Sequence, residues 1–170
     1  MTIKIAINGF GRIGRLALRA AWHRDDYQIV QINEIAGDAS AAAHLLKYDS
    51  VHGRFPGEVR IEDGYLNLGQ NDIEVMSTYH LEELDWSGCD VVLECTGKFN
   101  DGNKANVHLE QGAKRVLLSA PGKNVDRTVV YGVNHDTMVK SDKMISNGSC
   151  TTNCLAPLAK VMHEAIGIES

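Results

Sequence analysis

Two short segments of the sequence have the residue types and spacing of chemical sites. Gly9, Gly11 and Gly14 form a G-x-G-x-x-G pattern, which suits a tight turn that brings backbone amides close to a pyrophosphate. The segment SCTTNC at residues 149–154 places a cysteine where a helix is predicted to begin. A helix N-terminus favours the thiolate, and its free amides can stabilise an oxyanion. Cys150 is therefore a candidate nucleophile for attack on a carbonyl carbon.

Each segment also has a purely structural interpretation. Glycines at this spacing occur in strand-to-helix turns that bind nothing, and a cysteine is often just a small buried residue. Cys150 and Cys154 would need further ligands to bind a metal, and no histidine or second cysteine pair stands at zinc-site spacing, so no metal site is predicted. Cys154, one helical turn after Cys150, is expected to pack in the core, as are Cys89 and Cys95 on either side of a predicted strand.

The glycine pattern lies between a predicted strand and a predicted helix. Residues 3–7 form a short β-rich run, and apolar residues recur at helical spacing over 12–24. A second β-rich run over 27–33 ends beside Glu34, where a carboxylate can accept hydrogen bonds from the adenosine ribose hydroxyls. Because that carboxylate would repel a 2′-phosphate, the sequence favours NAD over NADP. Arg12 is either a phosphate ligand or an exposed helix residue, and both interpretations stay open.

The rest of the chain continues the alternation of strands and helices, with one insert. Ser40 is expected to cap a helix that runs to about residue 48. The insert is a hairpin around Asp63-Gly64, a dipeptide suited to the positive φ angles of a tight turn. Further elements are predicted as strands at 58–61, 65–68, 73–76, 89–95, 115–119, 128–133 and 143–146, and as helices at 103–111 and 150–166.

This order of elements predicts an α/β fold of the doubly wound type. Strands that alternate with helices form a mostly parallel sheet covered on both faces, here with an antiparallel insert. Ligands bind such sheets beyond the carboxyl ends of the strands. The loops after Ile7, Ile32, Leu93 and Leu118 are therefore the predicted binding site.

Composition excludes several functional classes. In a chain of 170 residues, 44% hydrophobic and 23% charged residues with three prolines are typical of one globular domain, or one domain and the beginning of another. A formal net charge of −5 provides no overall basic field for nucleic acid or an anionic membrane. No run approaches the ~18 apolar residues of a membrane span, and Lys4 interrupts the N-terminal run, so neither a membrane helix nor a signal peptide is predicted. We expect a cytoplasmic protein with reduced cysteines.

The two segments together resemble the phosphorylating glyceraldehyde-3-phosphate dehydrogenase family. The resembling stretches are INGFGRIGR, INE, LLKYDSVHGRF, ECTGKF, GAKRVLLSAP, VVYGVNHD and ISNGSCTTNCLAPLAK. They are spread over nearly the whole chain, and INGFGRIGR and SCTTNCLAPLAK are the most specific. The resemblance implies a Rossmann-type NAD-binding domain over residues 1–149. It also implies that residues 150–170 are the first helix of a truncated catalytic, substrate-binding domain.

The resemblance further implies an activity and its residues. In that family a cysteine thiolate attacks glyceraldehyde 3-phosphate, hydride passes to NAD, and inorganic phosphate cleaves the thioester to give 1,3-bisphosphoglycerate, a step of glycolysis and gluconeogenesis. Cys150 would be the nucleophile. The implied cofactor contacts are Asn8, Gly9, Phe10, Gly11, Arg12, Ile13, Glu34, Thr96, Gly97 and Ser119. The implied substrate contacts are Ser149, Cys150 and Thr151, and the implied assembly is a homotetramer.

Departures from the family pattern keep alternatives open. Glu34 is a longer acid than the usual Asp and is also found in erythrose-4-phosphate dehydrogenases, so that activity is one alternative. Many relatives place an arginine near the adenine where this chain has MSTY at 76–79, which makes Tyr79 a candidate adenine contact. The family's catalytic histidine falls beyond Ser170, so we expect this chain alone to bind NAD without turnover. A stand-alone NAD-binding or regulatory module is the other alternative.

Overall fold

The computed structural model describes residues 2–69 and 72–169. Its helices are α1 (Arg12–Ala21), α2 (Ala39–Lys47), α3 (Gly102–Ala105), α4 (Val107–Glu110) and α5 (Cys150–Ile166), with the 3-10 turns η1 (Leu81–Glu83) and η2 (His135–Thr137). Its strands are β1 (Ile3–Asn8), β2 (Tyr27–Asn33), β3 (Tyr48–Asp49), β4 (Gly53–Arg54), β5 (Arg60–Glu62), β6 (Tyr65–Asn67), β7 (Asp72–Met76), β8 (Val91–Glu94), β9 (Arg115–Leu118), β10 (Arg127–Thr128) and β11 (Met144–Ser146).

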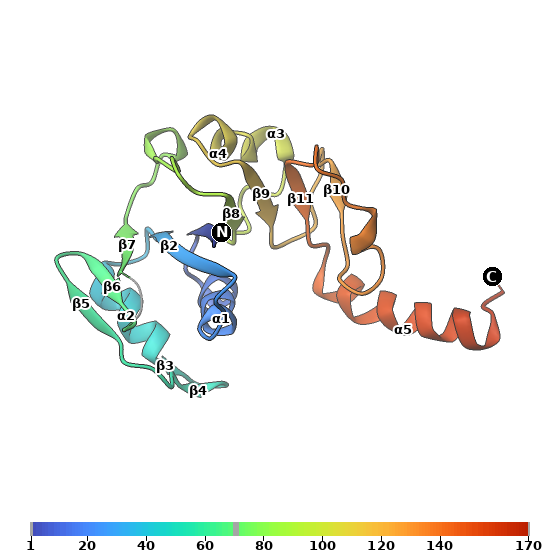
Figure 1. Cartoon of the computed structure of the whole chain (residues 1–170), viewed down its shortest axis with the longest axis horizontal. Coiled ribbons are helices and arrows are strands. Elements are labelled where there is room, and N and C mark those ends of the chain that lie inside the picture. The colour runs from blue at the N-terminus through green and yellow to red at the C-terminus, as the bar shows by residue number, and fades with distance from the viewer. Residues whose placement is uncertain (1, 70–71, 170) are drawn as a thin grey trace.

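A nine-stranded sheet forms the frame of the molecule (Figure 1). Its strand order is β10-β11-β9-β8-β1-β2-β7-β6-β5. The strands from β10 to β7 pair in parallel, and β5, β6 and β7 pair antiparallel. The chain builds outward from β1 to β7 on one side and then from β8 onward on the other, so β1 and β8 mark the topological switch point. This order confirms the predicted Rossmann-type fold with an antiparallel insert.

The insert continues the main sheet. Asp63 and Gly64 have φ angles of 49° and 85°, as the predicted tight turn requires. β7 pairs antiparallel with β6 on one side and parallel with β2 on the other. The hairpin therefore extends the sheet beyond β7.

Several predicted boundaries are wrong in detail. α2 is capped by Asp38, whose carboxylate accepts a hydrogen bond from the Ala41 amide at 2.9 Å, and Ser40 lies inside the helix. The helix expected over 103–111 is divided into α3 and α4, which meet at Asn106. Of the strand expected over 128–133, only Thr128 lies in a strand, as the last residue of β10. The small sheet of β3 and β4 was not predicted.

Two apolar clusters pack on opposite faces of the central strands, because successive side chains of a strand point to opposite faces. Ile7 of β1 belongs to the cluster that packs against α1 and α2, together with Leu18 and Leu46. Ala6 belongs to the second cluster, which is covered by Trp86 and other residues of the segment that includes η1. The carboxyl ends of the central strands lie between these two layers.

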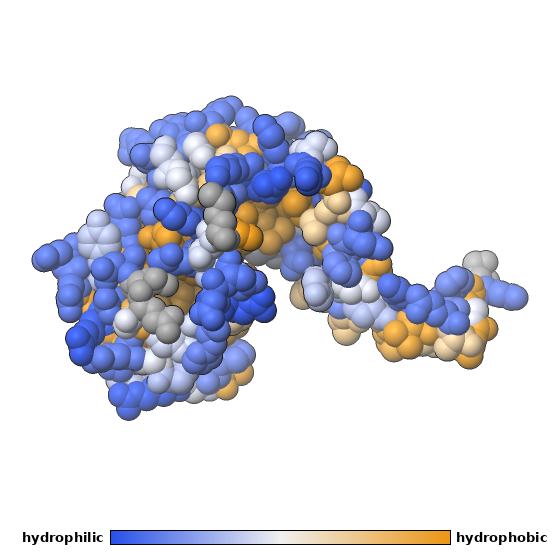
Figure 2. Space-filling view, viewed as in Figure 1, coloured by the Kyte–Doolittle hydropathy of each residue, from blue (hydrophilic) through white to orange (hydrophobic). Residues whose placement is uncertain are grey.

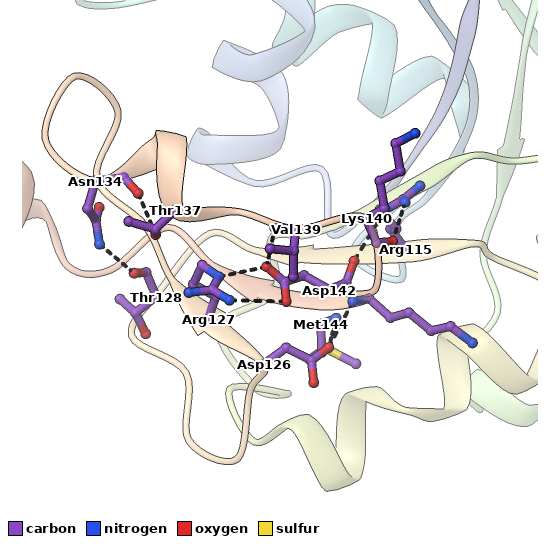
Figure 3. Close-up of polar contacts among 11 residues, drawn as sticks. Arg115, Asp126, Arg127, Thr128, Asn134, Thr137, Val139, Lys140, Asp142 and Met144 are labelled. Carbon is purple, nitrogen blue, oxygen red and sulfur yellow. Dashed lines mark hydrogen bonds and ion pairs between the residues drawn. The ribbon is translucent and has the colours of Figure 1, made fainter.

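Polar contacts fix the β10 edge of the sheet (Figure 3). The Arg127 Nε donates to Asp142 Oδ2 at 2.6 Å, and the Val139 amide donates to the same oxygen at 2.9 Å. The guanidinium, and next the amide, hold the pKa of Asp142 below its ordinary value. Asp126 accepts from the amide of Met144 at 2.8 Å. The connection between β10 and β11 is therefore tied down by carboxylates.

α5 lies outside both layers. Figure 1 shows it leaving the body of the molecule and extending away from the sheet. Over the whole of Cys150–Ile166 no residue is buried, and Leu158 and Ile166 are 57% and 77% exposed. Figure 2 shows apolar surface along this helix. The predicted helix is confirmed, but the prediction that Cys154 packs in the core is wrong, because Cys154 is exposed. Among the described residues, no helix is both long enough and apolar enough to cross a bilayer.

Candidate cofactor site

Three polar residues stand in register where the central strands end. Asn8 of β1 is paired with Asn33 of β2 on one side and with Glu94 of β8 on the other. All three are buried, with 1%, 3% and 1% of their surface exposed. The loops that follow these strands therefore start from a common polar floor at the switch point.

A cavity of about 360 Å³ opens above this floor. It is lined by Asn8, Gly9, Gly11, Asn33, Glu34, Ile35, Ala36, Thr78, Tyr79, Leu81, Cys95, Thr96, Lys98 and Phe99. The lining combines backbone of the glycine loop and one carboxylate with aliphatic and aromatic side chains. Its size and mixed chemistry are typical of a cofactor or small-molecule site.

The three glycines of the loop are required for different reasons. Gly9 has a φ of 91°, and a Cβ there would stand 2.8 Å from the Thr96 amide nitrogen. A Cβ on Gly14 would stand 2.3 Å from the Gly9 carbonyl oxygen. Gly11 has an ordinary φ of −70°, and a Cβ there would meet no atom of the described residues within 4 Å. The fold therefore requires Gly9 and Gly14, whereas Gly11 is explained by a ligand that approaches the backbone at the start of α1.

This arrangement fits the pyrophosphate of a dinucleotide. α1 begins at Arg12, so its unpaired amides and the positive end of its macrodipole lie beside Gly11 at the cavity. An anion placed there is stabilised without any basic side chain. The open approach over Gly11 and the amides at the helix start are the two features that such a phosphate group needs.

Glu34 joins the end of β2 to the glycine loop. Its Oε2 accepts a hydrogen bond from the Phe10 amide at 2.7 Å, and its Oε1 accepts one from the Ala36 amide at 2.8 Å. Each carboxylate oxygen has capacity for a second donor, such as a ribose hydroxyl. Glu34 lines the cavity, so its charge faces the ligand as well as the loop. A ligand phosphate at this position would be repelled.

Part of the cavity lining is apolar. Leu81, Phe99 and Ile35 belong to this part, and Tyr79, the predicted adenine contact, also lines the cavity. Tyr79 is 71% exposed, so its ring is available to a ligand from the solvent side. A flat aromatic base placed against these side chains would bury apolar surface that is otherwise in water.

The structure brings together half of the predicted cofactor contacts. Asn8, Gly9, Gly11, Glu34 and Thr96 line the cavity. The other five predicted contacts, which the described lining does not include, are Phe10, Arg12, Ile13, Gly97 and Ser119.

The surroundings of four of these five residues differ from the prediction. Phe10 is buried in the core and offers only its amide, which Glu34 already accepts. The guanidinium of Arg12 lies 3.8 Å from Asp49 Oδ2 in β3, and Ile13 is 53% exposed. Ser119 donates its amide to the Glu94 carbonyl at 3.0 Å.

Sequence reasoning missed much of the rest of the lining. The missed residues are Asn33, Ile35, Ala36, Thr78, Leu81, Cys95, Lys98 and Phe99. Most of them follow the strand ends at β2 and β8, which the sequence had already marked. Thr78 and Leu81 follow β7, a strand that the sequence assigns to the insert. The parallel pairing of β7 with β2 brings the carboxyl end of β7 to the same edge of the sheet.

Cys150 stands at the start of α5, as predicted, but it does not line the described cavity. Ser149 caps the helix, since its Oγ accepts a hydrogen bond from the Thr152 amide at 2.9 Å. Cys150 itself is exposed. The predicted substrate contacts Ser149, Cys150 and Thr151 are therefore adjacent to one another and separate from the lining of the cofactor cavity.

The two thiols of the central sheet have a different environment. Cys89 is buried, as predicted, and Cys95 is half-buried in the cavity wall. Burial raises the pKa of Cys89 and of Cys95 to about 11. Both are therefore poor nucleophiles near neutral pH. In the described ranges, no three His, Cys, Asp or Glu side chains gather in a way that could hold a metal ion.

Comparison with protein families decides how this geometry is interpreted. Residues 3–102 match the model of the glyceraldehyde 3-phosphate dehydrogenase NAD binding domain, and residues 149–170 match that of the C-terminal domain of the same family. The chain belongs to this family. NAD is thus the cofactor of this domain.

Curated relatives agree with the family assignment. The chain is 54% identical over 170 residues to a glyceraldehyde-3-phosphate dehydrogenase of Cereibacter sphaeroides, with 99% of this chain and 51% of the relative covered. It is 53% identical to one of Pseudomonas aeruginosa (99% and 52% covered) and 50% identical to one of Geobacillus stearothermophilus (99% and 51% covered). The chain spans about half the length of the curated relatives that it matches.

Proposed function

We propose that this protein provides the NAD-binding half and the nucleophile of a phosphorylating glyceraldehyde-3-phosphate dehydrogenase. The observation that carries the proposal is the open approach over Gly11 at the start of α1, beside the carboxylate of Glu34. That pair of features fits a dinucleotide without a 2′-phosphate. The exposed Cys150 at the start of α5 supplies the thiol that the oxidation of an aldehyde through a thioester requires.

The proposed chemistry begins at Cys150. Its thiolate adds to the aldehyde carbon of glyceraldehyde 3-phosphate and forms a thiohemiacetal, whose oxygen takes up a proton. The hydroxyl proton is released as the hydride leaves this carbon, and NAD, when bound, supplies the hydride acceptor. The thioester that results is attacked by inorganic phosphate, which releases 1,3-bisphosphoglycerate and returns the thiolate. The Cys150 amide at the helix start is placed to stabilise the oxyanion.

Residues of the glycine loop hold the cofactor in this proposal. Gly9 and Phe10 shape the turn, since their amides donate to Asn33 and Glu34. The amides of Gly11, Arg12 and Ile13 face the pyrophosphate, and Arg12 adds a cationic side chain when it turns away from Asp49. Gly97 and Ser119 extend the binding surface beyond Thr96 towards the reacting end of the cofactor. Ser149 and Thr151 flank the nucleophile and contact the substrate.

The wider setting is also proposed. Residues 1–149 are the NAD-binding domain and residues 150–170 begin the catalytic domain. The functional assembly is a homotetramer in the cytoplasm, where a reduced Cys150 is maintained. The free state of all four cysteines is consistent with that compartment.

The first test is a calorimetric titration of the protein with NAD and, separately, with NADP. Saturable binding of NAD with an NADP Kd at least about tenfold higher is expected, because Glu34 opposes a 2′-phosphate. In Glu34→Ala this ratio should fall towards unity. Tighter binding of NADP than of NAD by the unmodified protein would refute the cofactor assignment.

The second test addresses turnover. A chimera that continues residue 170 with the matching second half of the Cereibacter sphaeroides relative should form NADH from NAD, inorganic phosphate and glyceraldehyde 3-phosphate. Cys150→Ser in the same chimera should lose nearly all of this rate, whereas Cys154→Ser should keep most of it. The relative rates of the complete protein on the two aldehydes separate the substrates, and faster oxidation of erythrose 4-phosphate there would replace the proposed substrate with that alternative. Steady NADH formation by the 170-residue chain alone would contradict our expectation that it binds NAD without turnover.

A further inference from the structure

A buried chain of hydrogen bonds runs beneath the cofactor cavity. Its members, in order, are Trp86, His108, Glu94, Asn8, Asn33 and Thr78. Trp86 and His108 are 0% exposed, and Glu94 is 1% exposed. Polar groups at this depth destabilise the fold unless each is paired, so the pattern of donors and acceptors along the chain is tightly constrained.

The first end of the chain fixes the proton of His108. The Trp86 indole can only donate, and its Nε1 lies 3.0 Å from His108 Nδ1. Nδ1 is therefore the acceptor, and the ring carries its proton on Nε2. Nε2 lies 3.0 Å from Glu94 Oε2, so it donates to that oxygen.

The opposite end of the chain fixes both asparagine amides. The Thr78 amide donates to Asn33 Oδ1 at 2.8 Å, so Asn33 Nδ2 is the donor that reaches Thr78 O at 3.0 Å and Asn8 Oδ1 at 2.9 Å. Asn8 must then turn its own Nδ2 towards Glu94 Oε2, which it reaches at 2.6 Å. Two lines of donors, each oriented from a fixed end, converge on one oxygen of Glu94.

The second oxygen of Glu94 holds the loop after β8. Oε1 accepts from the Thr96 amide at 2.7 Å and also from the Thr96 hydroxyl. Glu94 thus receives four donors, and only a side chain that accepts on both oxygens satisfies them. A glutamine would place its NH₂ group either against the fixed donors of Asn8 and His108 or, turned over, against the Thr96 amide, which also can only donate.

We propose that Glu94 is a positioning residue of the NAD site, which acts by holding Asn8 and Thr96 at fixed separation. Both of these residues line the cavity, whereas Trp86 and His108 do not belong to its described lining. The backbone of Thr96 is also the wall against which Gly9 packs, so a shift of Thr96 displaces the glycine loop. The inference rests on the proposed NAD site and assigns it a buried support, Trp86 and His108, that lies outside its described lining.

The test compares Glu94→Gln with Asp142→Asn. Each exchanges a buried carboxylate for its amide, but Asp142 lies at the β10 edge and outside the described cavity lining. Both variants should melt at lower temperature than the unmodified protein. Glu94→Gln should raise the Kd for NAD about tenfold or more, because buried donors lose their acceptor, while Asp142→Asn should change it by less than about twofold. Glu94→Asp, which keeps the charge on a shorter stem, should fall between them.

A folded Glu94→Gln variant with the unmodified Kd, or an equal rise of Kd in both variants, would overturn the proposal. If Glu94→Gln does not fold, Trp86→Phe decides, since it keeps an aromatic side chain at this position and removes the indole donor that sets the His108 proton. Trp86→Phe should raise the Kd for NAD about threefold and reduce the signal of the Nε2-protonated form of His108 in ¹⁵N NMR. An unchanged Kd for NAD in this variant would overturn the proposal. Failure of the unmodified protein to bind NAD would instead refute the proposed function.

Discussion

The cofactor edge of the sheet and helix α5 differ in how much of their structure this chain supplies. At the cofactor edge, Asn8, Asn33 and Glu94 are buried and bonded to one another, and apolar clusters pack on both sides. Over the whole of α5 no residue is buried, although its apolar residues repeat at helical spacing. Both regions have regular sequence patterns. Such a pattern shows which residues of a segment can be buried, whereas only the packing shows whether this chain buries them.

The largest expected effect comes from shortening one leucine in each region. Leu66 of β6 is 0% exposed in the core, and Leu158 is 57% exposed on α5. Leu66→Ala should lower the free energy of unfolding by about 3 kcal/mol, since it removes buried methyl groups and leaves a cavity. Leu158→Ala should change it by less than about 0.5 kcal/mol. Urea denaturation of both variants measures the difference, and equal losses would contradict the contrast between the two regions.

Thiol reactivity should separate the same regions. At about pH 8, a thiol whose pKa is about 11, as for Cys95, is ionised in only about one molecule in a thousand. Cys150 and Cys154 are exposed, and we expect them to react with iodoacetamide about a hundredfold faster than Cys95. Mass spectrometry of the folded protein measures the rates, and denatured protein is the control in which this difference should vanish. Labelling of folded Cys95 at the rate of Cys154 would show that the cavity wall opens readily.

Local patterns predicted the elements of the fold better than they predicted its contacts. β1, β2 and α5 have strong periodicity, and their positions are confirmed. The cap of α2 was misassigned because Asp38 and Ser40 are both good N-cap residues, and only the geometry shows which one bonds to Ala41. The division between α3 and α4 has no glycine or proline to signal it.

The glycine loop and Glu34 were found because their chemistry is local to two strand ends. The link between Glu94 and Asn8 could not be found in this way, because the two residues are 86 positions apart and meet only through the parallel pairing of β1 and β8. Periodicity identifies β8 as a buried strand and gives no role to the acid at its end. Long-range register, which sets such contacts, is not encoded in any short segment.

The glycine loop allows the cofactor site to be separated from the fold that supports it. Gly11→Ala should leave the melting temperature nearly unchanged, because its Cβ meets no described atom, and should raise the Kd for NAD about tenfold by obstructing the phosphate. Gly14→Ala should cost about 2 kcal/mol of stability, because its Cβ would press on the Gly9 carbonyl. Calorimetry and thermal denaturation of both variants provide the comparison. Unchanged NAD binding by Gly11→Ala would mean that the cofactor does not approach the backbone closely enough to require a glycine at this position.

The smallest effect is expected at the β10 edge, in acid. Arg127 and the Val139 amide hold the pKa of Asp142 below its ordinary value of 3.8, so the folded state binds this proton less readily than the unfolded state. The stabilisation is therefore fully present above that value and is lost as the pH falls through the lower pKa of the folded protein. Asp142→Asn should thus have a lower free energy of unfolding than the unmodified protein at neutral pH, and this difference should narrow as the pH falls below 3.8.

Glu58→Gln, which breaks the exposed pair with Arg60, is the matched control, and its free energy of unfolding should differ little from that of the unmodified protein at any pH. Denaturation curves over a series of pH values test this, and a deficit of Asp142→Asn that stays constant into strong acid would mean that packing of the side chain, and not its charge, secures this edge of the sheet.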